Sequence, residues 1–357
     1  MEERSLKRLR FLIVAGLTLA VVIFLSWPRQ AGDPDFDPRV EAPAYGSRLG
    51  PHPVVLIDQA HFNVHTMAKR YKPLADLLRS DGYDVRPNTK TFTAEGLRRA
   101  DVLVVANALG LGGAAQHLLI LLRLDRLFDL TGSAFSRREC EAVAAWVRDG
   151  GSLLLVADHA PTGKAAARLS AVFGVGMSNG WAEDESPNHD PVTGSWGFLV
   201  FSRDNGLLAD HPVTGGRSGA ERVSRVVTFT GQALRAPAAS VPFLRLSPTA
   251  RLYQRARSAD NDFVPAGGLC QGLALEFGRG RIVVLGEAAV LTSQKAVGPA
   301  GELHFGLDWP GADNRRLALN ILHWLSRLSG LDPRAEKSPS QPQRSAVPPS
   351  LTGQRSR

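Results

Sequence analysis

The chain has 357 residues and is 44% hydrophobic, so it carries enough apolar side chains for a folded core and is not a disordered protein. Its formal net charge of +8 is compatible with nucleic-acid binding, but much of the excess lies in the basic segment 1–10 and in the tail 331–357. No arginine-rich stripe with interleaved aromatic residues occurs, so we expect no nucleic-acid partner.

Residues 11–27 contain no charged side chain and follow the basic segment, a layout typical of a signal peptide or a signal anchor. Arg29 would occupy a position that a cleavage site reserves for a small residue, which favours a retained transmembrane anchor. The positive-inside rule then places residues 1–10 in the cytoplasm and the rest of the chain outside. Segment 28–53, rich in Pro, Gly and Asp, predicts a linker between the anchor and the domain.

From residue 54 onward, short apolar runs alternate with segments of helical spacing. The expected strands cover residues 54–58, 83–86, 101–106 and 152–157. The expected helices cover residues 67–80, a short stretch after Thr93, residues 136–148 and residues 165–173. Ser136 and Glu139 form a capping-box pattern at the start of the third helix. This alternation predicts an α/β domain with a mostly parallel sheet and helices on both faces.

Residues 174–266 lose this rhythm and are interpreted as an insertion with a strand near 225–230. Residues 272–277 and 281–286 flank a Gly-Arg-Gly turn, which predicts a hairpin, and residues 313–328 predict a closing helix. The domain is therefore expected to span 54–330. The tail 331–357 has too few apolar residues to order itself and is expected to be disordered.

Polar residues gather where the expected strands end. The candidates for a ligand site are Asp58, His61, Asn63 and His65 after the first strand, Asn107 after the third, Asp158 and His159 after the fourth, and Glu287 after the last. Parallel strands place their carboxyl ends at one edge of a sheet, and a strand order of 2-1-3-4 would bring the first, third and fourth ends side by side. We therefore predict one shared pocket at that edge.

Two chemical interpretations of this set compete. His61 and His65 are four residues apart, a spacing that can grip a metal, and Asp158 and His159 would complete the ligands of a divalent cation. Glu287 would then accept a proton from the metal-bound water. The alternative is a set of helix caps and packed imidazoles with no shared ligand.

The runs VLIDQAHFNVHT, WVRDGGSLLLVADHAP and GRGRIVVLGEAA resemble an uncharacterised bacterial family of class I glutamine amidotransferase-like domains. That family is related to gliding-motility transporter-accessory and intraflagellar-transport modules. The resemblance covers residues 54–328 and implies a flavodoxin-like fold. Together with the expected anchor, the bacterial family implies the inner (cell) membrane of a bacterium as the location, with the domain periplasmic or extracellular. Family members continue the last motif with a Met-Phe-Thr-Ala-Gln-like run, where this chain has VLTSQ at 290–294.

Amidotransferases carry a cysteine thiolate on the sharp turn that here follows residues 152–157, and this chain has Asp158 and His159 there. Cys140 and Cys270 fall in an expected helix and strand, where we expect buried free thiols, and no GxSxG motif occurs. Two functional hypotheses follow. The first is a noncatalytic binding or scaffolding module for an envelope glycan or a partner protein. The second is a metal-dependent hydrolase.

Overall fold

A computed structural model describes residues 29–45, 52–110, 115, 132–185, 197–254, 263–298 and 301–328. The predicted anchor at 11–27 and the predicted disordered tail at 331–357 lie outside these ranges and remain predictions. Among the described helices, none is both long and apolar enough to cross a bilayer.

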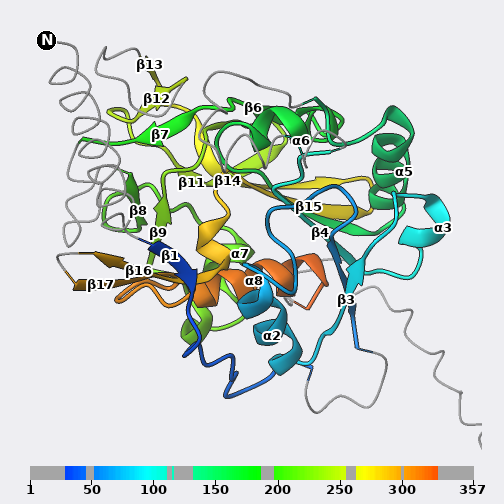
Figure 1. The fold of residues 1–357 in the computed structure, drawn as a ribbon, viewed down its shortest axis with the longest axis horizontal. Helices are drawn as coiled ribbons and strands as arrows, with labels where there is room; N and C mark the ends of the chain where they lie inside the picture. The colour runs from blue at the N-terminus through cyan, green and yellow to red at the C-terminus, as the bar shows by residue number, and fades with distance from the viewer. Residues whose placement is uncertain are drawn as a thin grey trace, which may run out of the picture.

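A mixed sheet forms the centre of the molecule (Figure 1). Its strands are β2 (Val54–Asp58), β3 (Asp84–Asn88), β4 (Val102–Ala106), β5 (Ser152–Val156), β6 (Gly176–Met177), β10 (Leu234–Arg235), β11 (Ser240–Arg245), β14 (Cys270–Phe277) and β15 (Gly280–Leu285). The order is β3-β2-β4-β5-β15-β14-β10-β6, with β11 paired to β14. The five strands from β3 to β15 are parallel to one another, and the others pair antiparallel. The predicted order 2-1-3-4 and the predicted hairpin, formed by β14 and β15, are confirmed.

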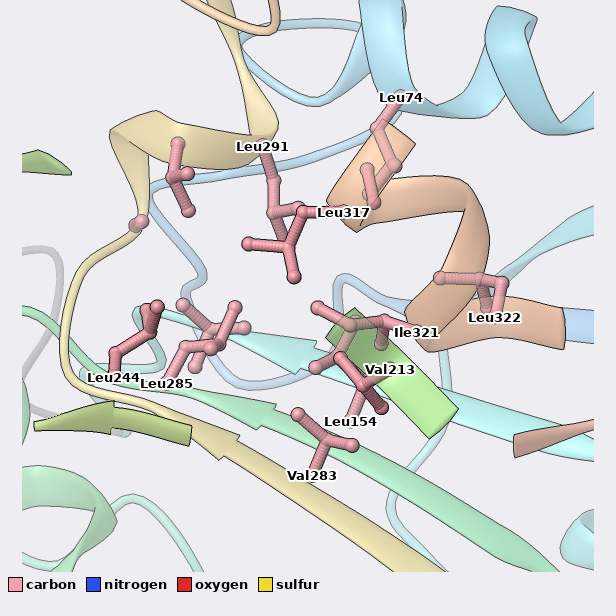
Figure 2. Packing of buried hydrophobic residues seen from close by; sticks show 14 of the residues in the cluster. Leu74, Leu154, Val213, Leu244, Val283, Leu285, Leu291, Leu317, Ile321 and Leu322 are labelled. Carbon is pink, nitrogen blue, oxygen red and sulfur yellow. The ribbon is translucent and has the colours of Figure 1, made fainter. Parts of the chain in front are cut away.

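Helices cover both faces of this sheet because its central strands are buried on both sides. One face packs on α3 (Ala94–Leu97), α5 (Arg137–Arg148) and α6 (Thr162–Ala171). The other packs on α2 (Lys72–Ser80), α7 (Pro212–Gly215) and α8 (Asn314–Leu325). Alternate residues of β5 point to the two faces, so Leu153 faces the α5 side whereas Leu154 lies below Val213 and Ile321 (Figure 2).

The helix boundaries follow local signals. Helix α5 begins at the predicted capping box, where the Ser136 side chain accepts from the Glu139 backbone N–H and Glu139 bonds back. Helix α2 begins at Lys72 and not at residue 67 as expected. Pro73 lies in its first turn, where a missing N–H costs nothing, and the preceding residues form turns closed by the bond from Tyr71 N to Thr66 O.

The expected insertion at 174–266 contributes strands both to the central sheet and to smaller sheets. Strands β6, β10 and β11 extend the central sheet, as given above. The smaller sheets contain β7 (Trp181–Glu183) with β12 (Arg251–Tyr253) and β13 (Phe263–Pro265), and β8 (Phe198–Ser202) with β9 (Arg225–Phe229). A short 3-10 helix, η1 (Gly219–Glu221), precedes β9, which matches the strand expected near 225–230.

Residues 29–45 pack against the domain and do not form the spacer expected from segment 28–53. Strand β1 (Arg29–Gly32) pairs with β16 (Ser293–Gly298), which in turn pairs with β17 (Gly301–Gly306). A second short 3-10 helix, η2 (Ala289–Leu291), precedes β16. The buried Tyr45 packs edge-on against Tyr83, with ring centroids 4.9 Å apart. Backbone pairing and a few apolar contacts dock this segment, so it needs no apolar periodicity.

Candidate functional site

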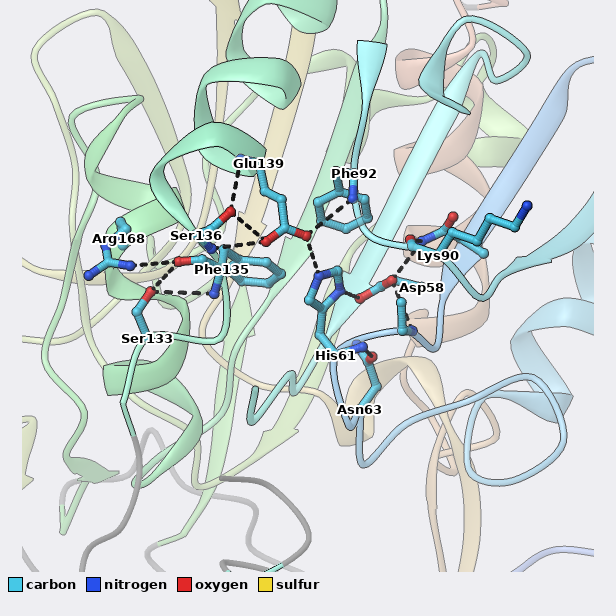
Figure 3. A network of polar contacts seen from close by, with 12 residues as sticks. Asp58, His61, Asn63, Lys90, Phe92, Ser133, Phe135, Ser136, Glu139 and Arg168 are labelled. Atoms are coloured by element: carbon cyan, nitrogen blue, oxygen red, sulfur yellow. Dashed lines mark hydrogen bonds and ion pairs between the residues drawn. The ribbon is translucent and has the colours of Figure 1, made fainter. Parts of the chain in front are cut away.

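A buried group of alternating charge lies where the end of β2, the loop after it and the start of α5 meet (Figure 3). This group, the His61 cluster, is made of Asp58, His61 and Glu139. His61 Nδ1 lies 2.8 Å from Asp58 Oδ2, and His61 Nε2 lies 2.8 Å from Glu139 Oε1. Carboxylate oxygens only accept, so both ring nitrogens donate and the imidazole is a cation. Burial alone would lower the pKa of His61, but Asp58 and Glu139 outweigh it and raise the pKa above its usual value.

Glu139 joins this cluster to the start of α5. Its Oε2 accepts from the backbone N–H and hydroxyl of Ser136, at 3.0 and 2.8 Å, and its Oε1 also accepts from Phe92 N at 3.2 Å. Burial alone would raise the pKa of Glu139, but these bonds and His61 lower it. The His61 ring packs against both Phe92 and Phe135, with ring centroids 4.6 and 4.8 Å away, and these two phenyl rings stack on each other at 5.8 Å. The cluster is thus enclosed by aromatic rings and fixed on both sides.

The side chain of Asn63 links the same loop to β4 by hydrogen bonds. Its Oδ1 accepts from His61 N at 3.1 Å, and its Nδ2 donates to Ala106 O at 3.1 Å. One residue later, Val64 N donates to Asn107 O at 3.0 Å. The loop after the first strand is therefore held directly against the end of the third.

Asn107 connects β4 to β5 at the carboxyl edge. Its Oδ1 accepts from Asp158 N at 2.9 Å, which assigns the other amide atom as nitrogen, and that nitrogen donates to His65 Nδ1 at 3.1 Å. Nδ1 of His65 must therefore carry no proton, which makes the imidazole neutral. Burial, aided by the charge of Arg70, lowers the pKa of His65 to about 3.

Asp158 and His159 lie on the turn after β5 and remain partly exposed, with 17% and 29% of their side-chain surfaces accessible. Asp158 Oδ1 accepts from His159 N at 2.9 Å. The His159 ring stacks on Trp181, with centroids 3.3 Å apart and planes 17° apart, and its Nδ1 donates to Ala160 O at 3.0 Å. His159 Nε2 lies 3.8 Å from Asp158 Oδ1.

Glu287 follows β15, two residues after its last residue, and is buried. Its carboxyl group accepts from Ala289 N and from Val290 N, the latter at 2.8 Å, and so caps η2. Burial, followed by the charge of Asp158, raises the pKa of Glu287 well above its usual value. Burial also raises the pKa of Tyr71 and lowers that of Arg70, whereas Asp158 opposes the Arg70 shift. Arg70 Nη1 also donates to Gln294 Oε1, and Tyr71 Oη donates to Ala288 O at 3.4 Å, so the segment before α2 contacts the segment after β15.

The structure divides the predicted site into two parts. His61 is enclosed on the α5 side of the sheet by Phe92 and Phe135, whereas His65 packs on Tyr71 near α2, with ring centroids 5.0 Å apart. The second part has a partly exposed group, Arg70, Asp158 and His159, which we call the edge group. Below it lies a buried layer of His65, Tyr71, Asn107 and Glu287.

The four proposed metal ligands do not converge. Both nitrogens of His61 are taken by carboxylates, Nδ1 of His65 is taken by Asn107, and His159 stacks on Trp181. Across the described ranges, no three His, Cys, Asp or Glu side chains are arranged to hold a metal ion. The hypothesis of a four-ligand cation site is therefore not supported by the geometry.

Several residues of these two parts were not among the candidates: Glu139, Arg70, Tyr71 and Trp181. Glu139 had a signal in the capping box, but that motif explains the residue fully without His61. Arg70 and Tyr71 precede α2 in a segment expected to be helical. Trp181 falls in the region expected to be an insertion, where no strand end pointed to it.

No protein-family model matches this sequence, and no curated protein matches it. Among solved structures, the mmIFT52 N-terminal domain is 13% identical with a TM-score of 0.49, over 76% of this chain and 97% of that one. Cytoplasmic Protein STM3548 from Salmonella typhimurium is 17% identical with a TM-score of 0.42, over 76% and 98% of the two chains. A putative ThuA-like protein from Bacteroides uniformis is 13% identical with a TM-score of 0.38, over 82% and 95%.

The evidence for a flavodoxin-like arrangement is accordingly the strand pairing itself. The order β3-β2-β4-β5-β15 is that of doubly wound folds, in which ligands bind beyond the carboxyl ends of the strands. The edge group lies at that position, on the turn after β5 and in the loop before α2.

The two cysteines lie away from this edge and are buried, Cys140 in α5 and Cys270 in β14. Burial raises the pKa of Cys140 and raises that of Cys270 to about 12, so neither is a thiolate at neutral pH. We expect an aromatic disulfide reagent to react negligibly with the native protein at pH 7.5 and with both thiols in denaturant. Rapid reaction of one thiol in the native protein would contradict this assignment.

Proposed function

We propose that this protein is a membrane-anchored ligand-binding module, and that its ligand is rich in hydroxyl groups, such as a glycan of the bacterial envelope. The observation that carries the proposal is the edge group, in which partly exposed polar side chains sit above a buried layer that is already hydrogen-bonded. Perturbed ionisable groups gathered at one sheet edge are typical of functional sites. Here the pKa values of His65, Arg70, Tyr71 and Glu287 are all shifted.

The free hydrogen-bonding capacity of the edge group matches a hydroxylated ligand. Among the described contacts, the Asp158 carboxylate uses only Oδ1, which accepts from His159 N and lies 3.8 Å from His159 Nε2. Arg70 donates from Nη1 to Gln294 Oε1 and keeps further guanidinium N–H groups for a ligand, near enough to Asp158 for that carboxylate to influence the pKa of Arg70. A sugar hydroxyl both donates and accepts, so it can satisfy the carboxylate or the imidazole and also receive a bond from the guanidinium.

At the buried candidates Glu287 and His65, the geometry fits binding better than catalysis. A group that transfers protons needs an unoccupied lone pair or proton aimed at the ligand. Glu287 instead accepts from two backbone N–H groups, and His65 Nδ1 accepts from Asn107. The turn that carries a nucleophile in amidotransferases carries the carboxylate of Asp158 here. These features support the noncatalytic hypothesis over the hydrolytic one.

The N-terminal segment that packs against the domain supports the anchoring part of the proposal, because it begins next to the predicted span. Only Pro28 separates the predicted span at 11–27 from β1, and the register places Arg29 opposite Val297, near the turn between β16 and β17. In an anchored protein this arrangement holds the domain directly at the membrane surface. The mature N-terminus, determined by mass spectrometry, would show whether the span is retained.

The test of the ligand is titration of full-length protein in lipid nanodiscs against an array of peptidoglycan and lipopolysaccharide oligosaccharides. We expect Asp158→Asn and Arg70→Met to raise the Kd of the strongest binder about 10- to 100-fold, since a hydrogen bond to a charged group contributes ~1.5–3 kcal/mol.

The matched controls are Asp149→Asn and Arg279→Met. These residues form an exposed Arg–Asp pair, 3.7 Å apart, where the chain enters β5 and β15, at the opposite edge of the sheet. Both controls should leave binding unchanged. Equal losses in all four variants, or no binding by the wild type, would contradict the proposal.

A further inference from the structure

Phe62 is an aromatic residue with an exposed side chain and an unfavourable backbone conformation. Its side chain is among the exposed large hydrophobic ones, with 43% of its surface accessible, and its φ is 52°. This left-handed conformation is unfavourable for an L-residue with a bulky side chain. The fold gains little from such a residue at this position, because a glycine would fit the backbone without strain.

The surrounding bonds force this conformation on Phe62. On one side, the carbonyl of His61 accepts from Leu109 N at 3.0 Å and Gly110 N at 2.9 Å, while the His61 ring is fixed between two carboxylates. On the other side, Asn63 bonds to His61 N and to Ala106 O. Strained residues held by rigid neighbours are concentrated at ligand-binding sites.

Phe62 also lies at the same edge as the edge group. Two residues after it, Val64 N donates to Asn107 O, and Asn107 accepts from Asp158 N. Strand β4 alone separates β2 from β5, so the loops after β2 and β5 are roughly 10 Å apart at the usual strand spacing. One oligosaccharide can therefore reach both Asp158 and Phe62.

We propose that Phe62 is an aromatic contact for the ligand, which packs the apolar face of a sugar ring on the phenyl ring, and that the His61 cluster is the device that holds it outward. This inference rests on the proposed glycan-binding function and adds a residue to it. The edge group supplies hydrogen bonds, and Phe62 supplies the apolar surface that a pyranose ring presents on its C–H face. Glu139 and Asp58 then act as positioning residues: besides His61, Asp58 accepts from Asn88 Nδ2, and Glu139 accepts from Ser136 and from Phe92 N.

The experiment measures binding and melting of full-length Phe62→Trp, Phe62→Ala and Phe62→Gly in nanodiscs, with the array oligosaccharide that the wild type binds best. Burying a phenyl ring against the ligand contributes to the binding free energy, and losing that contribution should raise the Kd of the Ala and Gly variants about 10- to 100-fold. Phe62→Trp should bind within about threefold of the wild type. The Gly variant should melt ~2–4 °C above the Ala variant, because only glycine relieves the positive φ.

The outcomes separate the two proposals. If the wild type binds, Asp158→Asn weakens binding and Phe62→Ala does not, the role of Phe62 is overturned and the glycan-binding function stands. If Phe62→Gly melts no higher than Phe62→Ala, the backbone is not strained and the argument for an outward-held ring is lost. If the wild type binds no oligosaccharide of the array, the glycan-binding function fails, and the ligand assigned to Phe62 fails with it.

Discussion

Replacement of His61 by alanine is expected to lower the free energy of unfolding by about 3–5 kcal/mol. Removing the imidazolium leaves Asp58, which is fully buried, and Glu139, which is 8% exposed, as two like charges with no cation between them. Urea denaturation followed by far-UV circular dichroism measures this loss, and the slope of the transition shows whether the native state stays compact.

The loss should depend on pH with a defined sign. His61 has a folded-state pKa above its unfolded value of 6.5, so its contribution is fully present below pH 6.5 and disappears as the pH rises through the folded-state pKa. Glu139 has a lowered pKa, so its contribution is present above pH 4.5 and disappears as the pH falls through the folded-state value. Stability added by the His61 cluster should therefore be greatest between these limits.

His211 provides a matched control. It is a half-buried histidine whose Nδ1 accepts from Val213 N at 3.2 Å, and burial lowers its pKa to about 4. Its folded state disfavours the proton, so the pH dependence that His211→Ala removes should lie below pH 6.5 and not above it. A His61→Ala loss under 1 kcal/mol, or the same pH profile in both variants, would contradict a charged His61 between two carboxylates.

The sequence predicts the sheet well because its central strands are buried on both faces. Runs such as 102–106 and 153–157 are continuously apolar, and the polar residues that follow mark their carboxyl ends. Topological rules then supply the strand order without any side-chain detail. That is why Asn107 and Asp158 were correctly placed at one edge, where they are joined by a hydrogen bond of 2.9 Å.

The same reasoning could not predict the division of the site. A spacing of four residues brings His61 and His65 together only on a helix, and the positive φ of Phe62 between them rules out a helical backbone. His61 instead pairs with Glu139, which is 78 residues away in the chain. No local pattern encodes a contact of that sequence separation, because the capping box already accounts for Glu139 within its own helix.

Short or isolated strands were also beyond the sequence pattern. Strands β6 and β10 contain two residues each, too few to show an alternation. They join the sheet by antiparallel pairs between distant segments, β6 with β10 across more than 50 residues and β10 with β14 from Leu234 to Cys270. Strand β1 gains its place through backbone bonds to β16. Backbone pairing of this kind leaves no side-chain signature, so segment 28–53 resembled a linker.

Replacement of Asn107 by alanine is expected to lower the free energy of unfolding by about 2–4 kcal/mol and to weaken ligand binding by the edge group. The change leaves the Nδ1 of the buried His65 and the backbone N–H of the partly buried Asp158 without their partners. It also puts alanine at a φ of 45°, where asparagine is tolerated better. Thermal melting and oligosaccharide titration of the same preparation measure the two effects.

Two further variants separate the causes. Asn107→Gly loses the same side-chain bonds but relieves the positive φ, so it should be about 1 kcal/mol more stable than Asn107→Ala. Asn107→Asp keeps an acceptor for Asp158 N but sets a carboxylate against His65 Nδ1, so His65 should bind a proton at higher pH, which a histidine NMR titration detects. If Gly and Ala are equally destabilising, φ carries no cost at this position. If all three variants stay within 0.5 kcal/mol of the wild type, Asn107 does not join the buried layer to the edge group.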